Sequence, residues 1–300
     1  MDFLKYKKFY YLFSGILLVA SIVGISLWGF RLGIDFKGGS ILEVEFSKIR
    51  PDNEKVQEAL KEFNFPELIL QPTQETALIL RFKEISEETH QKILNKLEES
   101  ANSLDKENTL KEKRFESVGP VIGRELQGSA LKMIIFALLG ISLYVAWAFR
   151  RVSKPVSSFK YGIATLIALF HDIMITCGFF SYLSHFSGVE IGIPFVVALL
   201  TLLGYSVSDT VVVFDRIREN LIKLSEKTFE GLINKSLRQT IVRSLNTSLG
   251  VIFILVAIYF FGGETLKYFV LALIIGIFFG TYSSIFIASP ILASFARKRN

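Results

Sequence analysis

Cysteine and catalytic sequence motifs are both scarce in this chain of 300 residues. Its one cysteine, Cys177, lies inside an apolar run, so we expect no disulfide and no thiol chemistry. The sequence has no phosphate-binding glycine loop, no zinc-ligand spacing and no nucleophile elbow. We therefore expect a protein that is not an enzyme and that needs neither a metal nor another cofactor.

Long apolar runs make up much of the sequence. Hydrophobic residues account for 51% of the chain, and 28 residues are phenylalanine. About 20 residues in a helix cross a hydrocarbon core of roughly 30 Å. Six runs reach that length with few or no charges, and each predicts a transmembrane helix: Leu12–Phe30, Ala130–Phe149, Tyr161–Leu183, Ile193–Phe214, Leu245–Phe261 and Tyr268–Phe295.

The charges between these runs predict how the chain is oriented. Lysine and arginine gather in residues 1–11, in the loops 150–160 and 215–243, and at the C-terminus, whereas the short loops on the other side hold only Lys267. Cytoplasmic loops are enriched in basic residues, so we expect both termini in the cytoplasm. The excess of basic over acidic residues then reflects membrane topology, and we expect no nucleic-acid partner.

One large segment, residues 31–125, is expected to form a periplasmic domain. It holds 15 basic and 19 acidic residues, a net charge of −4, while the rest of the chain carries +10. Its patterns predict strands and helices in the order βαββαβ, which is typical of a small ferredoxin-like α+β domain. The predicted elements are Ser40–Phe46, Asp52–Phe63, Leu68–Gln71, Ala77–Phe82, Ser86–Leu97 and Arg114–Val118, with a solvated loop as the alternative for 102–112.

Three domains follow from these patterns. Residues 1–30 form a cytoplasmic tail and the first helix, retained as an anchor, and residues 31–125 form the periplasmic domain. Residues 126–300 supply the other five helices, the loops 150–160 and 215–243, and a C-terminal tail. Within the second loop, Asp215–Ser236 alternates charged and apolar residues, which predicts an interfacial amphipathic helix or, equally, a solvated connector.

Four ionisable residues inside the apolar runs are the candidate functional groups. An ionisable side chain costs about 2.5–3.5 kcal/mol at the centre of a spanning helix, so it normally faces a bundle interior or a water path. The four are His171, Asp172, Asp209 and Arg243. Polar residues that could extend a relay or a polar network lie nearby: Tyr205, Ser206, Thr210, Asn246 and Thr247.

Asp209 and Arg243 are predicted to lie at the same depth, because they sit near the cytoplasmic ends of two antiparallel helices. Such a pair can alternate between two ionised partners and a protonated aspartic acid with the arginine released, as a proton-coupled step requires. The alternative for Arg243 is a long side chain that reaches the lipid headgroups. For His171 and Asp172 the alternative is an interhelical hydrogen-bonded pair that only stabilises packing.

Several stretches together resemble the SecF family, the smaller half of the bacterial SecDF complex. They span nearly the whole chain, and the most specific is Gly204–Asn220, GYSVSDTVVVFDRIREN. The others are Gly33–Gly39, Ser117–Leu126, His171-Asp172, Arg243–Ser248 and Thr281–Leu292. Lys37, Ser208 and Ser244 depart from the expected residues but leave the charged groups intact.

The resemblance implies a fold and a role. SecDF is similar to resistance–nodulation–division transporters, so the chain would form one half of a pseudo-symmetric transporter-like assembly. Paired with SecD, it would use the proton-motive force to promote late steps of preprotein translocation, with Asp209 and Arg243 in the proton pathway. Implied partners are SecD, the SecYEG translocon, the translocating preprotein, the lipid membrane and, as further candidates, YajC and YidC.

Two other functions remain open from the sequence. One is half of a small-molecule or lipid exporter of the same superfamily, although a periplasmic segment of 95 residues is small for a substrate-pocket domain. The other is a scaffold or chaperone that stabilises a membrane complex without coupling to protons. Loss of activity in Asp209→Asn and Arg243→Met would favour proton coupling over the scaffold.

Overall fold

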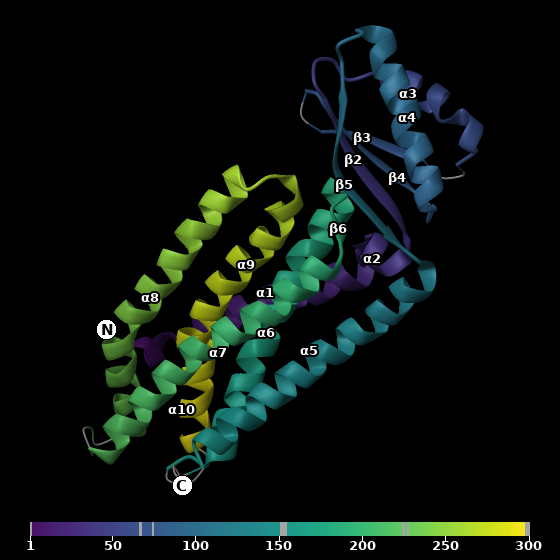
Figure 1. Ribbon diagram of the computed structural model, residues 1–300. Coiled ribbons are helices and arrows are strands. Elements are labelled where there is room, and N and C mark those ends of the chain that lie inside the picture. The colour runs from purple at the N-terminus through teal and green to yellow at the C-terminus, as the bar shows by residue number, and fades with distance from the viewer. Residues whose placement is uncertain are drawn as a thin grey trace. The chain divides into compact units, whose positions relative to one another are not determined.

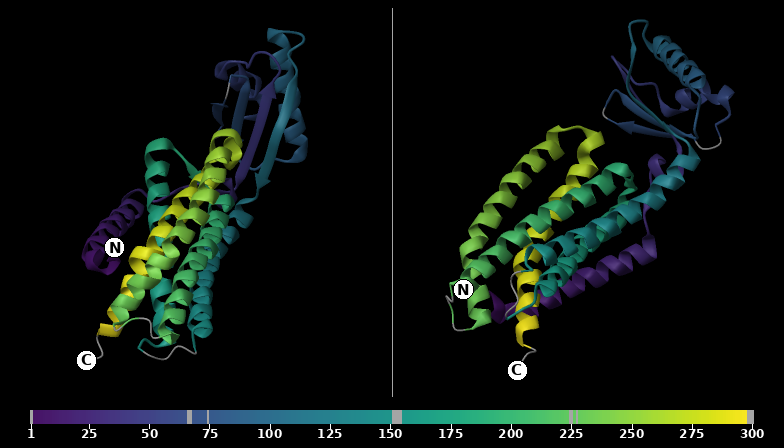
Figure 2. Two further views of the ribbon diagram at one scale, coloured as in Figure 1. Left: turned by 90° about the vertical axis from the view of Figure 1, so that its left-hand side faces the viewer. Right: turned by 60° about the horizontal axis from the view of Figure 1, so that its bottom comes forward.

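The computed structural model describes residues 2–65, 68–73, 75–150, 155–223, 226 and 228–297, without the side chains of residues 264, 265 and 297. The chain divides into two compact units (Figures 1 and 2). One unit comprises residues 1–31 and 130–300, and the other comprises residues 32–129. The predicted periplasmic domain, 31–125, differs from the second unit by one residue at its start and four at its end.

The prediction of six spanning helices is confirmed, since six helices in the described part of the chain are long and apolar enough to cross a membrane. The first is α1, which follows a short 3-10 turn, η1 (Phe3–Tyr6). The sixth consists of α9, a π-helical segment η3 (Ser284–Ala288) and α10. The helices are α1 (Lys7–Trp28), α5 (Pro120–Ala148), α6 (Ser158–Ser187), α7 (Ile193–Ile222), α8 (Phe229–Phe261), α9 (Glu264–Ser283) and α10 (Ser289–Arg297).

Helices α6, α7 and α9 form the centre of the helical unit. Buried residues make up 61% of the apolar stretch in α6 and in the sixth span, against 11% in α5 and 17% in α1 and α8. The two glycines of Gly276–Gly280 allow α9 to approach α7 closely, as small residues do between membrane helices. A Cβ atom built on Gly276 would lie 2.7 Å from Leu202, and one on Gly280 would lie 2.9 Å from Ser206.

The predicted interfacial helix over 215–236 is wrong. Helix α7 continues without a break to Ile222, and α8 already begins at Phe229, so most of the predicted loop 215–243 is helical (Figure 1). Ile217 and Ile233 are buried in the same apolar cluster, which explains why both helices extend beyond their apolar runs. In the predicted loop 150–160, residues 151–154 lie outside the described residues, and α6 begins at Ser158.

The predicted βαββαβ order of the second unit is confirmed. The elements are β2 (Gly39–Phe46), α3 (Asn53–Ala59) with the 3-10 turn η2 (Lys61–Phe63), β3 (Ile69–Thr73), β4 (Ala77–Phe82), α4 (Glu87–Leu104) and β5 (Leu110–Val118). Their sheet has the order β3-β4-β2-β5, and each neighbouring pair is antiparallel. Leu42 and Val44 of β2 and Leu80 of β4 pack against Val56 and Ile93 of the two helices. This is the ferredoxin-like arrangement.

The structure also adds detail to the predictions for residues 102–112 and 33–39. The alternative of a loop over 102–112 holds only for residues 105–109, because α4 runs to Leu104 and β5 starts at Leu110. The stretch Gly33–Gly39 contains a short helix, α2 (Ile34–Lys37), which is followed by Gly38 with φ at 81°. A Cβ at Gly38 would lie 2.7 Å from the Cα of Pro120, so both backbone conformation and space favour glycine there. Two-residue strands occur at β1 (Arg31–Leu32) and β6 (Glu190–Ile191).

Candidate functional site

A cavity of about 370 Å³ between α7 and α8 contains the first pair of predicted residues. Asp209 and Arg243 both line it, as do Tyr205 and Thr247. The remaining lining residues are Ser208, Val212, Ser244 and Val251. The cavity therefore presents one carboxylate, one guanidinium and several hydroxyl groups on an otherwise apolar wall.

The Asp209 carboxylate is held by hydroxyl groups. Asp209 is 7% exposed, and its Oδ2 accepts hydrogen bonds from Ser248 at 3.3 Å and from Thr281 at 3.0 Å. These donors come from α8 and α9, so the aspartate of α7 joins three helices. Hydrogen-bond donors of this kind reduce the cost of placing a charge among apolar side chains.

Arg243 shares the cavity with Asp209 without forming a contact ion pair. Among the described residues, no nitrogen of Arg243 lies within 4.0 Å of a carboxylate oxygen, and its side chain is exposed in this chain. Ser244, next to it on α8, is buried, and its Oγ has no hydrogen-bond partner in the described part of the chain. The cavity thus separates the two opposite charges and leaves a buried hydroxyl on its wall.

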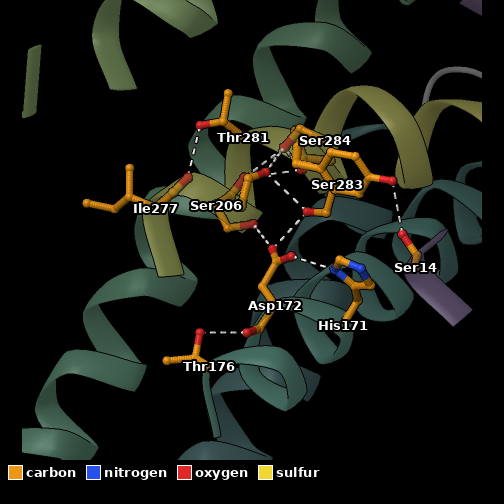
Figure 3. Close-up of polar contacts among 12 residues, drawn as sticks. Ser14, His171, Asp172, Thr176, Ser206, Ile277, Thr281, Ser283 and Ser284 are labelled. Atoms are coloured by element: carbon orange, nitrogen blue, oxygen red, sulfur yellow. Dashed lines mark hydrogen bonds and ion pairs between the residues drawn. The ribbon is translucent and has the colours of Figure 1, made fainter. Parts of the chain in front are cut away.

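A second carboxylate, Asp172 of α6, lies at the centre of the helical unit and is fully buried (Figure 3). Its Oδ1 is 2.9 Å from Nδ1 of the neighbouring His171. Its Oδ2 accepts hydrogen bonds from Ser206 of α7 at 2.6 Å and from Ser283 of α9 at 2.8 Å. Asp172 therefore ties together the three most buried helices of the unit.

His171 is almost as buried as Asp172, with 1% of its surface exposed. Its ring stacks on Tyr282 with the centroids 6.1 Å apart, and the hydroxyl of Tyr282 accepts a hydrogen bond from Ser14 of α1 (Figure 3). Its Nε2 has no hydrogen-bond partner within the described residues. The hydrogen bond between His171 and Asp172 lies within α6. The predicted interhelical hydrogen bonds are therefore made by the aspartate and not by the histidine.

The structure divides the residues predicted from the sequence into two groups. Asp209, Arg243, Tyr205 and Thr247 meet at the cavity, while His171, Asp172 and Ser206 meet in the buried network. Thr210 adjoins the buried network through a 2.8 Å hydrogen bond with Ser284. Asn246 is exposed in this chain and lines neither group.

Sequence reasoning missed the hydroxyl groups that hold the two carboxylates. Ser206 was among the predicted site residues, but Ser283 and Thr281 of α9 and Ser248 of α8 were not. A usable signal was present, because Thr281–Ser284 places three hydroxyl residues and a tyrosine in a row within an apolar span. No group of three or more metal-ligating side chains occurs in the described ranges.

Comparison with known proteins identifies the family. Residues 96–298 match the family described as "Protein export membrane protein SecD/SecF, C-terminal", and residues 29–48 match the "SecD/SecF GG Motif". The chain is 44% identical to the protein translocase subunit SecF of Thermobaculum terrenum, over 99% of this chain and 95% of that protein. It is 37% identical to the subunit of the same name from Anaerolinea thermophila, over 97% of this chain and 93% of that protein.

Solved structures of SecDF match the whole fold. The crystal structure of SecDF from Thermus thermophilus, described as a translocon-associated membrane protein, superposes with a TM-score of 0.78 at 31% identity over 99% of this chain. SecDF in a super-membrane-facing form gives a TM-score of 0.69 at 31% identity. This chain spans 39% of each of those longer chains. The six helices, the ferredoxin-like unit and these similarities together show that the chain is a membrane protein of the SecF family.

Proposed function

We propose that this chain is an auxiliary subunit of the Sec protein translocase, in which a proton moving through the Asp209 cavity drives a late step of preprotein export. The single observation that carries the proposal is the cavity between α7 and α8, where a buried carboxylate and a guanidinium face the same space. Family membership supports the export role, because the relatives carry the name protein translocase subunit SecF.

The composition of the cavity supports proton exchange at Asp209. Two hydroxyl donors stabilise the ionised carboxylate, so the charge persists at low cost. When the carboxylate takes up a proton, each hydroxyl has another hydrogen-bond partner: the two hydroxyls lie 2.5 Å from each other, and Thr281 can also turn to its own helix. Thr281 lies 3.1 Å from the carbonyl of Ile277. Arg243 adds a positive charge whose attraction for Asp209 is present only in the ionised state.

The proposal also names partners and an orientation. SecD would supply the other half of the assembly, in keeping with the 39% share of the SecDF chains that this chain spans. The SecYEG translocon, YajC and YidC are proposed as further contacts. The charge distribution supports an orientation in the bacterial inner membrane with both termini in the cytoplasm and the ferredoxin-like unit in the periplasm. In this role the chain couples transport and performs no covalent chemistry.

Preprotein import into inverted membrane vesicles tests the proposal. Vesicles contain the chain and its SecD partner, and export is measured with and without a proton gradient. Asp209→Asn keeps the shape of the side chain and removes the exchangeable charge, so the gradient-dependent part of export is expected to vanish. Asp209→Glu is the matched control, because it keeps a carboxylate, and part of the gradient dependence is expected to survive.

Assembly must be measured on the same membranes. Recovery of SecD with an affinity-tagged chain shows whether each variant still forms the complex. Unchanged export and unchanged gradient dependence in Asp209→Asn and Arg243→Met, with the complex intact, would refute proton coupling at this site. The scaffold function would then account for the family membership.

A further inference from the structure

The stretch Thr281–Ser284 lies between the two buried carboxylates and contacts both. Thr281 donates to Asp209, and Ser283 donates to Asp172. Ser284 hydrogen-bonds to Thr210 of α7 at 2.8 Å. The two carboxylates share no hydrogen bond with each other among the described residues, so this four-residue stretch of α9 is a link that touches both.

Each hydroxyl of the stretch has more acceptors than protons. A serine or threonine hydroxyl carries one proton to donate. The oxygen of Thr281 lies 3.0 Å from Asp209 Oδ2 and 3.1 Å from the carbonyl of Ile277. The oxygen of Ser283 lies 2.8 Å from Asp172 Oδ2 and 3.1 Å from the carbonyl of Gly280. Ser283 must therefore choose between the Asp172 carboxylate and a carbonyl of its own helix (Figure 3). Thr281 faces the same choice at Asp209, with the hydroxyl of Ser248 at 2.5 Å as a third hydrogen-bond partner.

The charge of each carboxylate decides that choice. An ionised carboxylate is a stronger acceptor than a backbone carbonyl, so it holds the hydroxyl proton. A protonated carboxyl is a weaker acceptor, and the hydroxyl can return to the carbonyl one turn earlier in α9. A hydroxyl that bonds back in this way competes with the helical N–H and tends to bend the helix.

The backbone changes conformation where this competition occurs. The N–H of Ser284 donates to the carbonyl of Gly280, and the hydroxyls of Ser283 and Ser284 lie 3.1 and 2.9 Å from the same oxygen. The π-helical segment η3 begins at Ser284, the residue whose N–H binds this crowded carbonyl. A π-helical turn inside an α-helix is a local alternative to the regular backbone and is frequent at functional sites. The stretch thus combines a competition for hydroxyl protons with a departure of the backbone from the regular α-helix.

We propose that Thr281–Ser284, at the junction of α9 and η3, couples the ionisation of Asp209 to that of Asp172 by exchanging hydroxyl protons between the carboxylates and the carbonyls of α9. Asp172 is then a positioning residue for the proton site, and Ser283 is the contact through which it acts. The inference rests on the proposed function, because it takes Asp209 to be the residue that gains and loses a proton.

Carbodiimide labelling of Asp209 tests the coupling directly. Dicyclohexylcarbodiimide reacts with protonated carboxyl groups in membranes, so labelling against pH follows the protonation of Asp209, with Asp209→Asn as the blank. The complete complex with SecD is used. In Ser283→Ala, the pH of half-maximal labelling is expected to move by about half a pH unit or more, as for residues in one hydrogen-bonded network.

Two control variants separate coupling from loss of a hydroxyl. Ser206→Ala removes the other donor to the same atom, Asp172 Oδ2, but leaves the contacts of α9 in place. Thr165→Val removes a buried hydroxyl that bonds only to the carbonyl of Tyr161 in its own helix. The midpoint is expected to stay close to that of the parent protein in Thr165→Val and to move less in Ser206→Ala than in Ser283→Ala.

Equal midpoints in Ser283→Ala and the parent protein would overturn the inference, and so would an equal shift in Ser206→Ala. The export assay with Asp209→Asn decides the proposed function independently of these midpoints. A thermal double-mutant cycle supplies a second measurement that needs no labelling. The loss of Tm in the Asp172→Asn/Asp209→Asn double variant should differ from the sum of the single losses by about 2 °C or more. Additive losses would also overturn the coupling.

Discussion

Replacing Gly178 of α6 by alanine is predicted to push α6 away from α1. A Cβ at Gly178 would lie 2.3 Å from both Cβ and Oγ of Ser21 and 2.6 Å from its Cα, whereas ordinary contacts begin at 3.4 Å. Because the obstacle includes backbone, no side-chain rotation can relieve it, and the helices must separate by about 1 Å.

The magnitude of the effect follows from two losses. Overpacking a close contact costs about 1–3 kcal/mol. Three residues further along α6, the hydroxyl of Ser181 donates across the same contact to the carbonyl of Gly29 at 2.7 Å, with that of Gly24 at 3.1 Å as its alternative. Losing that bond costs about 0.5–1.5 kcal/mol more. The sum, about 1.5–4.5 kcal/mol, corresponds to a fall in Tm of roughly 3–18 °C at about 2–4 °C per kcal/mol.

The assay is thermal unfolding of the purified complex in detergent, followed by circular dichroism of the helical signal. Gly15→Ala on α1 is the matched control, because a Cβ there has no heavy atom within 4 Å. Alanine is a better helix former than glycine, so Gly15→Ala is expected to leave Tm unchanged or raise it slightly. A change of less than about 1 °C in Gly178→Ala would refute the packing argument.

Three further predictions concern buried or paired polar groups. Asp172→Ala leaves the buried hydroxyl of Ser206 without its acceptor and removes the partner of His171 Nδ1, while Ser283 can turn to the carbonyl of Gly280. Tm should therefore fall by more than about 5 °C, and by less in Asp172→Asn; equal losses would contradict this account. The backbone N–H of Glu107 and then Lys48 hold the pKa of Asp105 below its usual range, so the stability it adds is present above the ordinary aspartate pKa and is lost as the pH falls through the lowered value. Hydrogen exchange of residues 105–109, corrected for intrinsic rates, should show protection that fades in acid in the parent protein but not in Asp105→Asn. Asn108→Ala removes the acceptor of the Lys48 N–H and the donor to the Ile49 carbonyl, so Tm is expected to fall. A Tm within about 1 °C of the parent value would show that these bonds add little.

The spanning helices and the ferredoxin-like unit could be predicted because their signals are local. An uninterrupted apolar run or an alternating strand carries its own periodicity, and the predicted starts of β2 and β4 fall within one residue of the structure. Helix ends were less predictable. The continuation of α7 to Ile222 depends on Ile217 packing against residues far away in the sequence, which a single-sequence pattern does not reveal.

The candidate site was predictable in its charges but not in its hydroxyl groups. Asp209 and Arg243 stand out because charge in an apolar run is costly, and the depth argument correctly brings them to one cavity. Ser283 and Thr281 carry no comparable cost, since a hydroxyl in a membrane helix can bond to its own backbone. Only the packing of α9 against α6 and α7 reveals that these two hydroxyls also reach the carboxylates.

The strand order of the ferredoxin-like unit has a consequence for the biosynthesis of the chain. Of the four strands in this sheet, β2 is made first and β5 last. Strand β2 nevertheless lies inside the sheet, between β4 and β5. Until residues 110–118 have been made, one edge of β2 stays open, and an open strand edge is a template for pairing with other chains. The next residue after Gly119 already begins α5, so closure of the sheet and insertion of the second spanning helix are nearly simultaneous in the growing chain. A nascent chain stalled before residue 110 would expose an unpaired edge of β2 to other polypeptides around it.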